Sequence, residues 1–214
     1  MTVRYCIGID EVGLGAWAGP FVVAAVVCRL DWEPPAQVRD SKKIPPAIRE
    51  QLVEKVLVPP AIEDNWIALR ESNDLKDSRY LSQFVLEIMT EVAGYALVHY
   101  PDSIIVADGV RVPKFPGVSS IAMAKADDLV PAVSAASIVA KVYRDNLMRE
   151  YAKEYPQYGF ERNAGYGTEY HRRAIKNHGL CPIHRLAYKP IRNALRRHKA
   201  LVRSGHGHHR GAQR

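Results

Sequence analysis

The sequence is poor in the features that mark secreted and membrane-bound proteins. Its 214 residues include only 3 cysteines (Cys6, Cys28 and Cys181), which lie far apart and form no Cys-x-x-Cys pair. This pattern argues for reduced thiols and against a structural zinc site. The N-terminus lacks the parts of a signal peptide, and no uninterrupted apolar run approaches the roughly 18–20 residues that span a bilayer. We therefore expect a cytoplasmic protein with no membrane attachment.

Acidic residues are missing from the C-terminal region. No Asp or Glu follows Glu169, whereas 12 Lys or Arg residues do. The first 169 residues carry 18 basic and 23 acidic side chains, a balance of −5 within a chain whose net charge is +7. This asymmetry indicates an acidic, metal-binding body and a basic C-terminal region that binds a polyanion. A solvated basic tail without a partner explains the charge equally well.

The apolar pattern predicts an α/β fold with a mixed sheet. Alternating apolar residues from Val3 to Ile9 predict a half-buried strand. The β-branched run 21–28 predicts a buried strand that pairs with it in antiparallel orientation. Further strands are expected at 65–70, 103–107 and 118–124, and helices at 81–95 and from 131 to about 155. Early strands followed by alternating helices and strands are typical of a mixed sheet with flanking helices.

The first predicted strand leads into two adjacent carboxylates and a glycine-rich turn. Asp10 and Glu11 are followed by Gly13 and Gly15, which let the backbone turn sharply. Adjacent residues on a strand point to opposite faces, so we expect the strand to end here, where both carboxylates can share one site. Carboxylates at a sheet edge suit hard divalent cations such as Mg²⁺. Alternatively, the pair consists of solvated residues that open a turn.

Two more acids follow apolar runs. Asp108 comes directly after the strand at 103–107, and Asp127 follows the run that ends at Ala124. In α/β sheets, sites form where strand ends converge. Four carboxylates from three elements can hold two cations about 4 Å apart, the arrangement used for in-line phosphoryl displacement. Taken singly, Asp108 fits an ordinary turn and Asp127 fits a helix cap.

These motifs resemble, in order, those of ribonuclease HII, the type 2 ribonuclease H. The family's Gly-hydrophobic-Asp-Glu-x-Gly-Arg-Gly segment is matched except at Leu14, which stands in place of the arginine. Its Asp-Gly, Lys-Ala-Asp, Ser-Ala-Ala-Ser-Ile-x-Ala-Lys-Val-x-Arg-Asp and Gly-Tyr-Gly-Thr motifs recur at 108–109, 125–127, 134–145 and 165–168. The resemblance covers roughly residues 7–190. It implies a ribonuclease H-like catalytic domain at 1–194, with a helical substrate-binding lobe at about 150–194, and a basic, flexible tail at 195–214.

On this match, Asp10, Glu11, Asp108 and Asp127 take the family's metal-binding and catalytic positions. The resemblance implies two Mg²⁺ or Mn²⁺ ions and hydrolysis of RNA in RNA–DNA hybrids. It also implies cleavage on the 5′ side of ribonucleotides embedded in DNA, leaving 5′-phosphate and 3′-hydroxyl ends, as DNA replication and repair require. Asp145 is instead expected to pair with nearby basic residues.

The resemblance also implies where the substrate is contacted. The backbone of Gly13, Leu14 and Gly15 reads the ribose 2′-hydroxyl, which distinguishes RNA from DNA. Tyr166 stacks on the deoxyribose, unless it simply fills a loop core. The remaining implied contacts are Ser41, Lys42, Lys43, His184 and Arg185, for which a solvated loop at 41–43 and a core histidine at 184 are equal alternatives.

Several alternatives stay open from the sequence. Leu14 removes a guanidinium that would contact phosphate, so a junction-restricted enzyme with weak activity on single ribonucleotides is one rival. A non-catalytic nucleic-acid-binding protein on the same fold is another, although intact acids argue against it. We expect a monomer. The tail contains no convincing aromatic pair for a sliding clamp, and it either grips nucleic acid or aids solubility.

Overall fold

The computed structural model describes residues 3–55 and 57–205, with side chains up to residue 197. The chain forms two compact units. The first, here called the sheet unit, contains the residues up to Leu14 together with Pro20–Arg70 and Arg79–Leu147. The second, the helical unit, contains Gly15–Gly19, Glu71–Ser78 and the chain from Met148 onward. The helical unit thus includes two short early segments besides the C-terminal part in which we expected a lobe.

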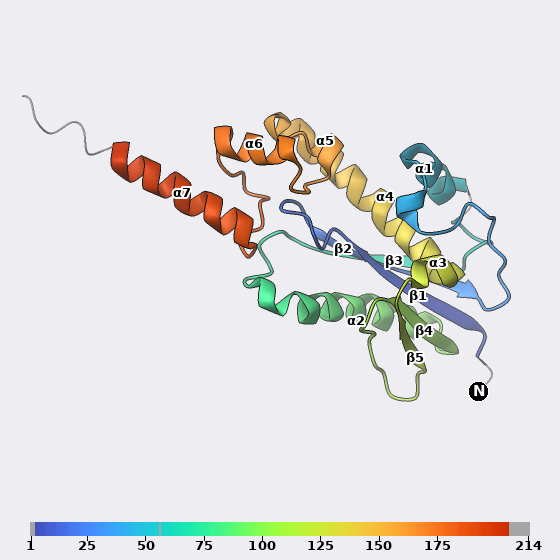
Figure 1. Ribbon diagram of the computed structural model, residues 1–214. Helices are drawn as coiled ribbons and strands as arrows, with labels where there is room; N and C mark the ends of the chain where they lie inside the picture. The colour runs from blue at the N-terminus through green and yellow to red at the C-terminus, as the bar shows by residue number, and fades with distance from the viewer. Residues whose placement is uncertain (1–2, 56, 206–214) are drawn as a thin grey trace, which may run out of the picture. The chain divides into compact units, whose positions relative to one another are not determined.

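The sheet unit is built on a five-stranded mixed sheet, which confirms the predicted fold class (Figure 1). The strand order is β3-β2-β1-β4-β5. The first three strands pair in antiparallel orientation, whereas β4 is parallel to both β1 and β5. The bounds are β1 Tyr5–Val12, β2 Phe21–Arg29, β3 Asp64–Arg70, β4 Ser103–Asp108 and β5 Ser120–Met123.

Two long helices cover the two faces of this sheet (Figure 1). On one face α2, Leu81–His99, packs on β1, β2 and β3 through an apolar stripe whose buried residues include Val85, Ile88 and Val92. By length and composition alone, α2 could cross a membrane. Its apolar stripe, however, is buried against the sheet. On the other face α4, Pro131–Glu154, approaches so closely that a Cβ on Gly8 would lie 2.1 Å from the carbonyl carbon of Ala132. The small residues of α4 therefore serve close packing.

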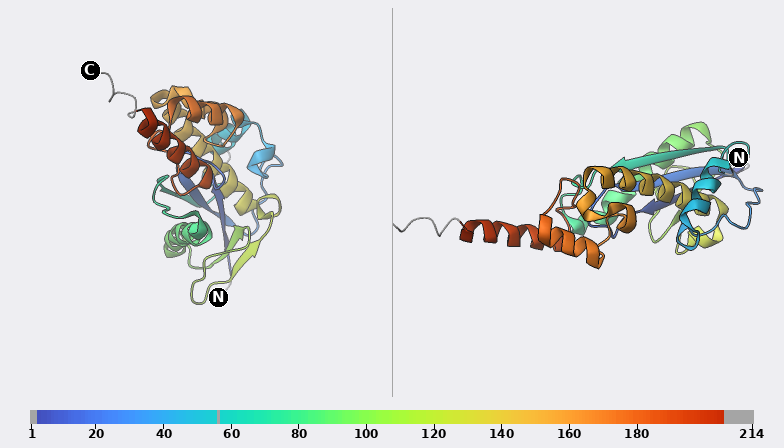
Figure 2. Two further views of the ribbon diagram at one scale, coloured as in Figure 1. Left: turned by 60° about the vertical axis from the view of Figure 1, so that its left-hand side comes forward. Right: turned by 90° about the horizontal axis from the view of Figure 1, so that it is seen from above.

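The smaller helices complete each unit. In the sheet unit these are α1, Pro46–Lys55, and α3, Ala126–Leu129. The helical unit contains α5 Phe160–Asn163, α6 Glu169–His178 and α7 Lys189–Gly205 (Figure 2). Helix α7 continues past residue 194 into the predicted tail, whose first half we expected could be helical. The glycine- and histidine-rich end at 206–214 lies outside the described residues.

The end of β1 lies where the glycine-rich turn predicts it. The strand includes both carboxylates and ends at Val12, directly before Gly13, and Asp10 and Glu11 pair with Ala24 and Val23 of β2. Pairing with β4, in contrast, stops where Ile9 meets Ala107. The sheet therefore opens beside the carboxylates on the β4 side only, because the antiparallel pairing runs further along β1 than the parallel one.

Candidate active site

Asp10 and Glu11 are held near the end of β1. Asp10 is only 5% exposed, and its Oδ1 accepts a hydrogen bond of 2.8 Å from the main-chain N–H of Glu11. Burial and the charge of Glu11 raise the pKa of Asp10 to about 8. Burial and the charge of Asp108 raise the pKa of Glu11 to about 7. Both shifts indicate that negative charge here is costly without a cation.

Asp108 and Asp127 are joined through α3. Asp108 Oδ1 accepts a hydrogen bond of 2.8 Å from the N–H of Ala126, the first residue of that short helix. Asp127 is the next residue and is 5% exposed. Burial, followed by the charge of Asp108, raises the pKa of Asp127. Asp108, at the end of β4, thus caps the N-terminus of α3. Asp127 lies within α3 and does not cap it.

The segment at 41–43 has a different role at each residue. Lys42 Nζ lies 3.7 Å from Asp127 Oδ2, which places an exposed ammonium beside the carboxylates. Lys43 instead pairs with Asp128, at 2.7 Å from Nζ to Oδ1. Ser41 is buried, and its Oγ lies 2.9 Å from Ser137 Oγ. The Ser41 side chain therefore has almost no exposed surface, and a phosphate contact by Ser41 stays a prediction.

The carboxylates fit divalent cations by their chemistry. In the described part of the chain, no group of three or more His, Cys, Asp or Glu side chains is already gathered closely enough to hold a metal ion. The donors are nevertheless all hard oxygens, and Asp10, Glu11 and Asp127 have raised pKa values caused by burial and by neighbouring negative charge. Mg²⁺ and Mn²⁺ prefer such ligands and would relieve this repulsion.

The turn after β1 is held by a buried arginine of α4. Gly13 has a φ of 91°, and a Cβ at this position would lie 2.3 Å from Arg144 Nε. Arg144 is completely buried, and its Nε donates a hydrogen bond of 3.0 Å to the carbonyl oxygen of Pro20. The turn therefore needs glycine at position 13, while Leu14 is half-buried. Apart from the place of Arg144 in the α4 motif, no pattern in the sequence indicates this role.

In the helical unit, two predicted substrate residues lie together. A Cβ on exposed Gly15 would be 3.6 Å from Tyr166 Cε1, and Tyr166 is 37% exposed. The next glycine of the motif, Gly167, lies against the indole of Trp17, since a Cβ there would be 2.4 Å from Trp17 Cε2. The main-chain N–H of Trp17 donates to the carbonyl oxygen of Gly165. The two glycine-rich segments are thus locked to each other, with the Tyr166 side chain partly exposed.

His184 and Arg185 have structural partners instead of exposed surface. Both residues are 0% exposed. His184 Nε2 lies 3.0 Å from Nε2 of His171, and Arg185 Nε donates to the carbonyl oxygen of Gly19 at 2.9 Å. Their burial favours the core histidine that was the alternative for His184, and a substrate contact by these two residues stays a prediction.

Other outcomes concern Asp145 in the sheet unit and two residues of the helical unit. Asp145 accepts hydrogen bonds from Lys141, at 2.7 Å, and from Arg49, at 3.2 Å, which confirms its expected pairing with basic residues. His171 and Trp17 were missed. Thr168, which caps α6 by accepting from the His171 N–H, marks the helix start and was the one signal that could have drawn attention to His171.

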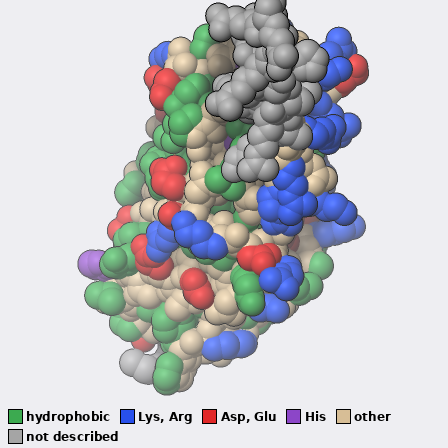
Figure 3. Space-filling model, turned by 90° about the vertical axis from the view of Figure 1, so that its left-hand side faces the viewer, with side chains coloured by type: hydrophobic (Ala, Val, Ile, Leu, Met, Phe, Trp, Pro, Cys, Tyr) green, Lys and Arg blue, Asp and Glu red, His purple; other side chains and the backbone are tan. Residues whose placement is uncertain are grey.

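Basic side chains dominate part of the surface. Figure 3 shows a face on which Lys and Arg side chains gather along one side, with single acidic side chains among them. In the helical unit the exposed basic residues include Lys153, Arg162, Arg172, Arg173, Lys176, Arg196 and Arg197. Such a surface attracts a polyanion without regard to its sequence.

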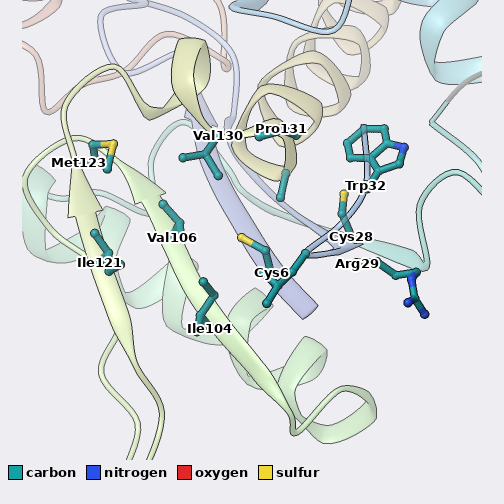
Figure 4. Close-up of a pocket in the computed structure, with 12 residues that line it drawn as sticks. Cys6, Cys28, Arg29, Trp32, Ile104, Val106, Ile121, Met123, Val130 and Pro131 are labelled. Atoms are coloured by element: carbon teal, nitrogen blue, oxygen red, sulfur yellow. The ribbon is translucent and has the colours of Figure 1, made fainter. Parts of the chain in front are cut away.

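The sheet unit also contains an apolar pocket of about 210 Å³ at the other end of β1 (Figure 4). Its lining includes Cys6, Cys28, Trp32, Met123 and Pro131. Burial raises the pKa of Cys6 to about 12, so its thiol stays neutral. All three cysteines are free. The pocket offers no carboxylate among its lining residues and thus no second metal-binding candidate.

The comparisons with known proteins agree with the motifs. A sequence model of the ribonuclease HII family matches residues 7–191. The ribonuclease HII of Chlorobium luteolum is 38% identical over 194 residues, which cover 87% of this chain and 89% of that protein. The PCNA:RNase HII complex from Archaeoglobus fulgidus contains a similar chain, with a TM-score of 0.65, 26% identity, and coverage of 88% of this chain and 96% of that one. Ribonuclease H2 from Pyrococcus horikoshii OT3 gives a TM-score of 0.63 and 25% identity, over 91% and 99% of the two chains.

Proposed function

The chain belongs to the ribonuclease HII family, a family of hydrolytic nucleases, and we propose that it is a metal-dependent endoribonuclease. Its proposed substrates are RNA–DNA hybrids and DNA duplexes with embedded ribonucleotides, which are cut on the 5′ side of the ribonucleotide. The observation that carries the proposal is the electrostatic coupling of Asp10, Glu11, Asp108 and Asp127. A purely structural cluster of acids would have no reason to keep charges that repel one another.

These four carboxylates would hold Mg²⁺ or Mn²⁺, in the proposed two-metal form. When bound, the ions would supply an activated water and would stabilise the negative charge on the leaving 3′ oxygen. In the hydrolysis, an oxygen–phosphorus bond forms to water and the bond from phosphorus to the 3′ oxygen breaks. The water's proton is lost to solvent and the 3′ oxygen gains one, which gives 5′-phosphate and 3′-hydroxyl ends.

The chain's own residues would prepare this site. Asp10 is oriented by the N–H of Glu11, and Asp127 is placed by the α3 helix that Asp108 caps. The ammonium of Lys42, 3.7 Å from Asp127, favours the charged form of that carboxylate. We assign Lys42 a further task, the attraction of a substrate phosphate, because its side chain is mostly exposed.

The helical unit would supply recognition of the sugar. Gly15 presents bare backbone next to the Tyr166 ring, and a flat, partly exposed aromatic ring can stack on a sugar or base. The exposed basic residues of the same unit would hold the phosphate backbone, with an affinity that falls as salt rises.

The test is cleavage of two end-labelled duplexes in Mg²⁺ or Mn²⁺ by the wild-type protein and by Asp10→Asn. One duplex contains a single ribonucleotide in DNA, and the other is an RNA–DNA hybrid. We expect 5′-side cleavage of both, lost in the variant and in EDTA. Tight binding without any cleavage would instead support the non-catalytic alternative.

Leu14 supports a second candidate, a junction-restricted enzyme. The family's arginine is replaced here by a side chain with no hydrogen-bond donor for phosphate, so incision at a single ribonucleotide would be weakened more than hybrid cleavage. Cleavage of the hybrid alone would favour this candidate. A monomer in the cytoplasm, acting in DNA replication and repair, remains our proposal for its setting. A sliding clamp is a candidate partner because one neighbouring structure is a PCNA complex.

A further inference from the structure

Two buried histidines in the helical unit lie in contact and have no part in the proposed chemistry. Nε2 of His171 and Nε2 of His184 are 3.0 Å apart, and both residues are 0% exposed. The rings of Tyr158 and Phe160 pack against them, with centroids 4.9 Å from His184 and 5.4 Å from His171. Such an apolar enclosure disfavours charge on either imidazole.

The partners of each ring determine which nitrogens carry protons. His184 Nδ1 lies 2.9 Å from the main-chain N–H of Cys181, which can only donate, and 3.1 Å from the carbonyl oxygen of the same residue. We assign Nδ1 as the acceptor of the shorter contact, which leaves the proton of neutral His184 on Nε2, where it can meet Nε2 of His171. His171 Nδ1 lies 3.0 Å from the carbonyl oxygen of Tyr166, which can only accept, so Nδ1 of His171 carries a proton. His184 Nε2–H then donates to His171 Nε2. The two assignments agree, and each nitrogen of the neutral pair has a partner.

This chain of hydrogen bonds ends at the backbone of Tyr166. The same carbonyl oxygen also accepts from the N–H of Thr168 at 2.8 Å. On the other side, the main chain at His184 forms a bridge with Ala18, and Arg185 N–H donates to the carbonyl oxygen of Trp17. The histidine pair therefore links the turn that carries Tyr166 to the segment Gly15–Gly19.

We propose that His171 and His184 are positioning residues that fix the Tyr166 turn against Gly15 and so set where the Tyr166 ring meets the substrate. The inference deepens the proposed function and rests on it, since it takes Tyr166 as a substrate contact. Neither histidine touches substrate, because both are buried. Their effect on binding must therefore pass through Tyr166.

A double-mutant cycle tests this route. Binding of an end-labelled, single-ribonucleotide duplex is measured by fluorescence anisotropy in the Asp10→Asn background with Mg²⁺, so that cleavage does not interfere. We expect His171→Phe to raise Kd by roughly threefold to tenfold, the size of one lost hydrogen bond. In a Tyr166→Ala background, the same substitution should leave Kd unchanged. An equal rise in both backgrounds would overturn the inference, because a general loss of structure acts without regard to Tyr166.

Matched variants separate positioning from folding. His171→Asn keeps an N–H in the place of Nδ1–H and should recover most of the affinity that His171→Phe loses. His178→Asn changes an exposed histidine of the same helix and should bind as well as the parent protein. Failure of His171→Asn to bind better than His171→Phe would count against the hydrogen-bond route.

A spectroscopic measurement on the wild-type protein avoids variants altogether. Two-bond ¹H–¹⁵N spectra should show both imidazoles neutral at neutral pH, with the proton on Nδ1 in His171 and on Nε2 in His184. The opposite tautomers, or a charged ring, would overturn the assignment. A failure of the proposed function would look different. The wild-type protein would not cleave either duplex, while the dependence of the His171→Phe effect on Tyr166 and the two tautomers would remain.

Discussion

Asp108 Oδ1 accepts a hydrogen bond from the N–H of Ala126, which joins the end of β4 to the helix that carries Asp127. The carboxylate thus has two separable properties, its oxygen as a cap and its charge as a metal ligand. Asp108→Ala removes both, so its free energy of unfolding should lie about 1 kcal/mol below that of Asp108→Asn, the size of a lost helix cap. Asp108→Asn keeps an accepting oxygen and removes a charge that raises the pKa values of Glu11 and Asp127.

We therefore expect Asp108→Asn to unfold in urea at a concentration equal to or above that of the wild-type protein, yet to lose cleavage. Urea titration in EDTA and hybrid cleavage in Mg²⁺ measure the two properties separately. A variant that is both unstable and inactive would show that Asp108 acts only through the fold.

Gly13 is predicted to be the glycine of the turn that tolerates substitution least. Gly13→Ala places a Cβ 2.3 Å from Nε of Arg144, which cannot move aside cheaply because it is buried and hydrogen-bonded to Pro20. Gly117 has a similar φ, 75°, but nothing lies within 4 Å of its Cβ position. Gly117→Ala should cost about 1–2 kcal/mol from backbone strain alone. Gly13→Ala should cost about 3 kcal/mol or more, since overpacking adds to that strain.

Equilibrium unfolding of the two glycine variants gives the comparison directly. If they are destabilised to the same extent, the contact with Arg144 has no energetic weight and only the backbone conformation matters.

The sequence predicted the carboxylates of the site better than the strand pairing around them. Asp10, Glu11, Asp108 and Asp127 follow apolar runs, and the structure couples them electrostatically. The glycine-rich turn also predicted where β1 ends, since the strand stops at Val12, directly before Gly13. The periodicity within β1 does not reveal that pairing with β2 continues to Val12 whereas pairing with β4 stops at Ile9.

Burial of polar residues was the property that the sequence could not reveal. Lys42 and Ser41 are neighbours in one motif, yet one is exposed beside Asp127 and the other is buried against Ser137. Arg144 and His184 are fully buried because each satisfies distant carbonyl or imidazole groups. Such partners are 124 and 13 residues away along the chain, so only the fold brings them together.

The raised pKa values predict that the metal-free protein loses stability as the pH rises. Asp10 and Glu11 have pKa values of about 8 and about 7 in the folded state, above those of the unfolded chain. Their contribution to stability is therefore complete below the unfolded values, about 4, and is lost as the pH rises through 7 and 8. In EDTA, the free energy of unfolding should fall by about 2 kcal/mol between pH 6.5 and pH 8.

The range above pH 6.5 is chosen because the buried histidines act in the opposite direction below it. Burial lowers the pKa of His184 to about 4, so this group loses its contribution as the pH falls from about 6.5. Urea midpoints at four pH values give the slope. Asp10→Asn should flatten it, whereas Asp31→Asn, which changes an exposed acid, should not. An unchanged slope in Asp10→Asn would mean that another group takes up the proton.

Leu14 provides the sharpest test of substrate preference, because it is the one departure from the family's first motif. Leu14→Arg restores a guanidinium beside the glycine turn, where it can form a charge-assisted hydrogen bond to a phosphate. We expect incision at a single ribonucleotide to rise by roughly tenfold, with a smaller gain on the hybrid, whose many ribonucleotides offer other contacts. Binding should also become more salt-dependent, with the slope of log K against log salt steeper by about 0.9 for one added phosphate contact.

Leu14→Met, which adds no charge, is the control and should change neither the rate of incision nor the salt dependence of binding. Equal gains on both duplexes would show that the arginine strengthens binding in general and that Leu14 does not narrow the substrate range.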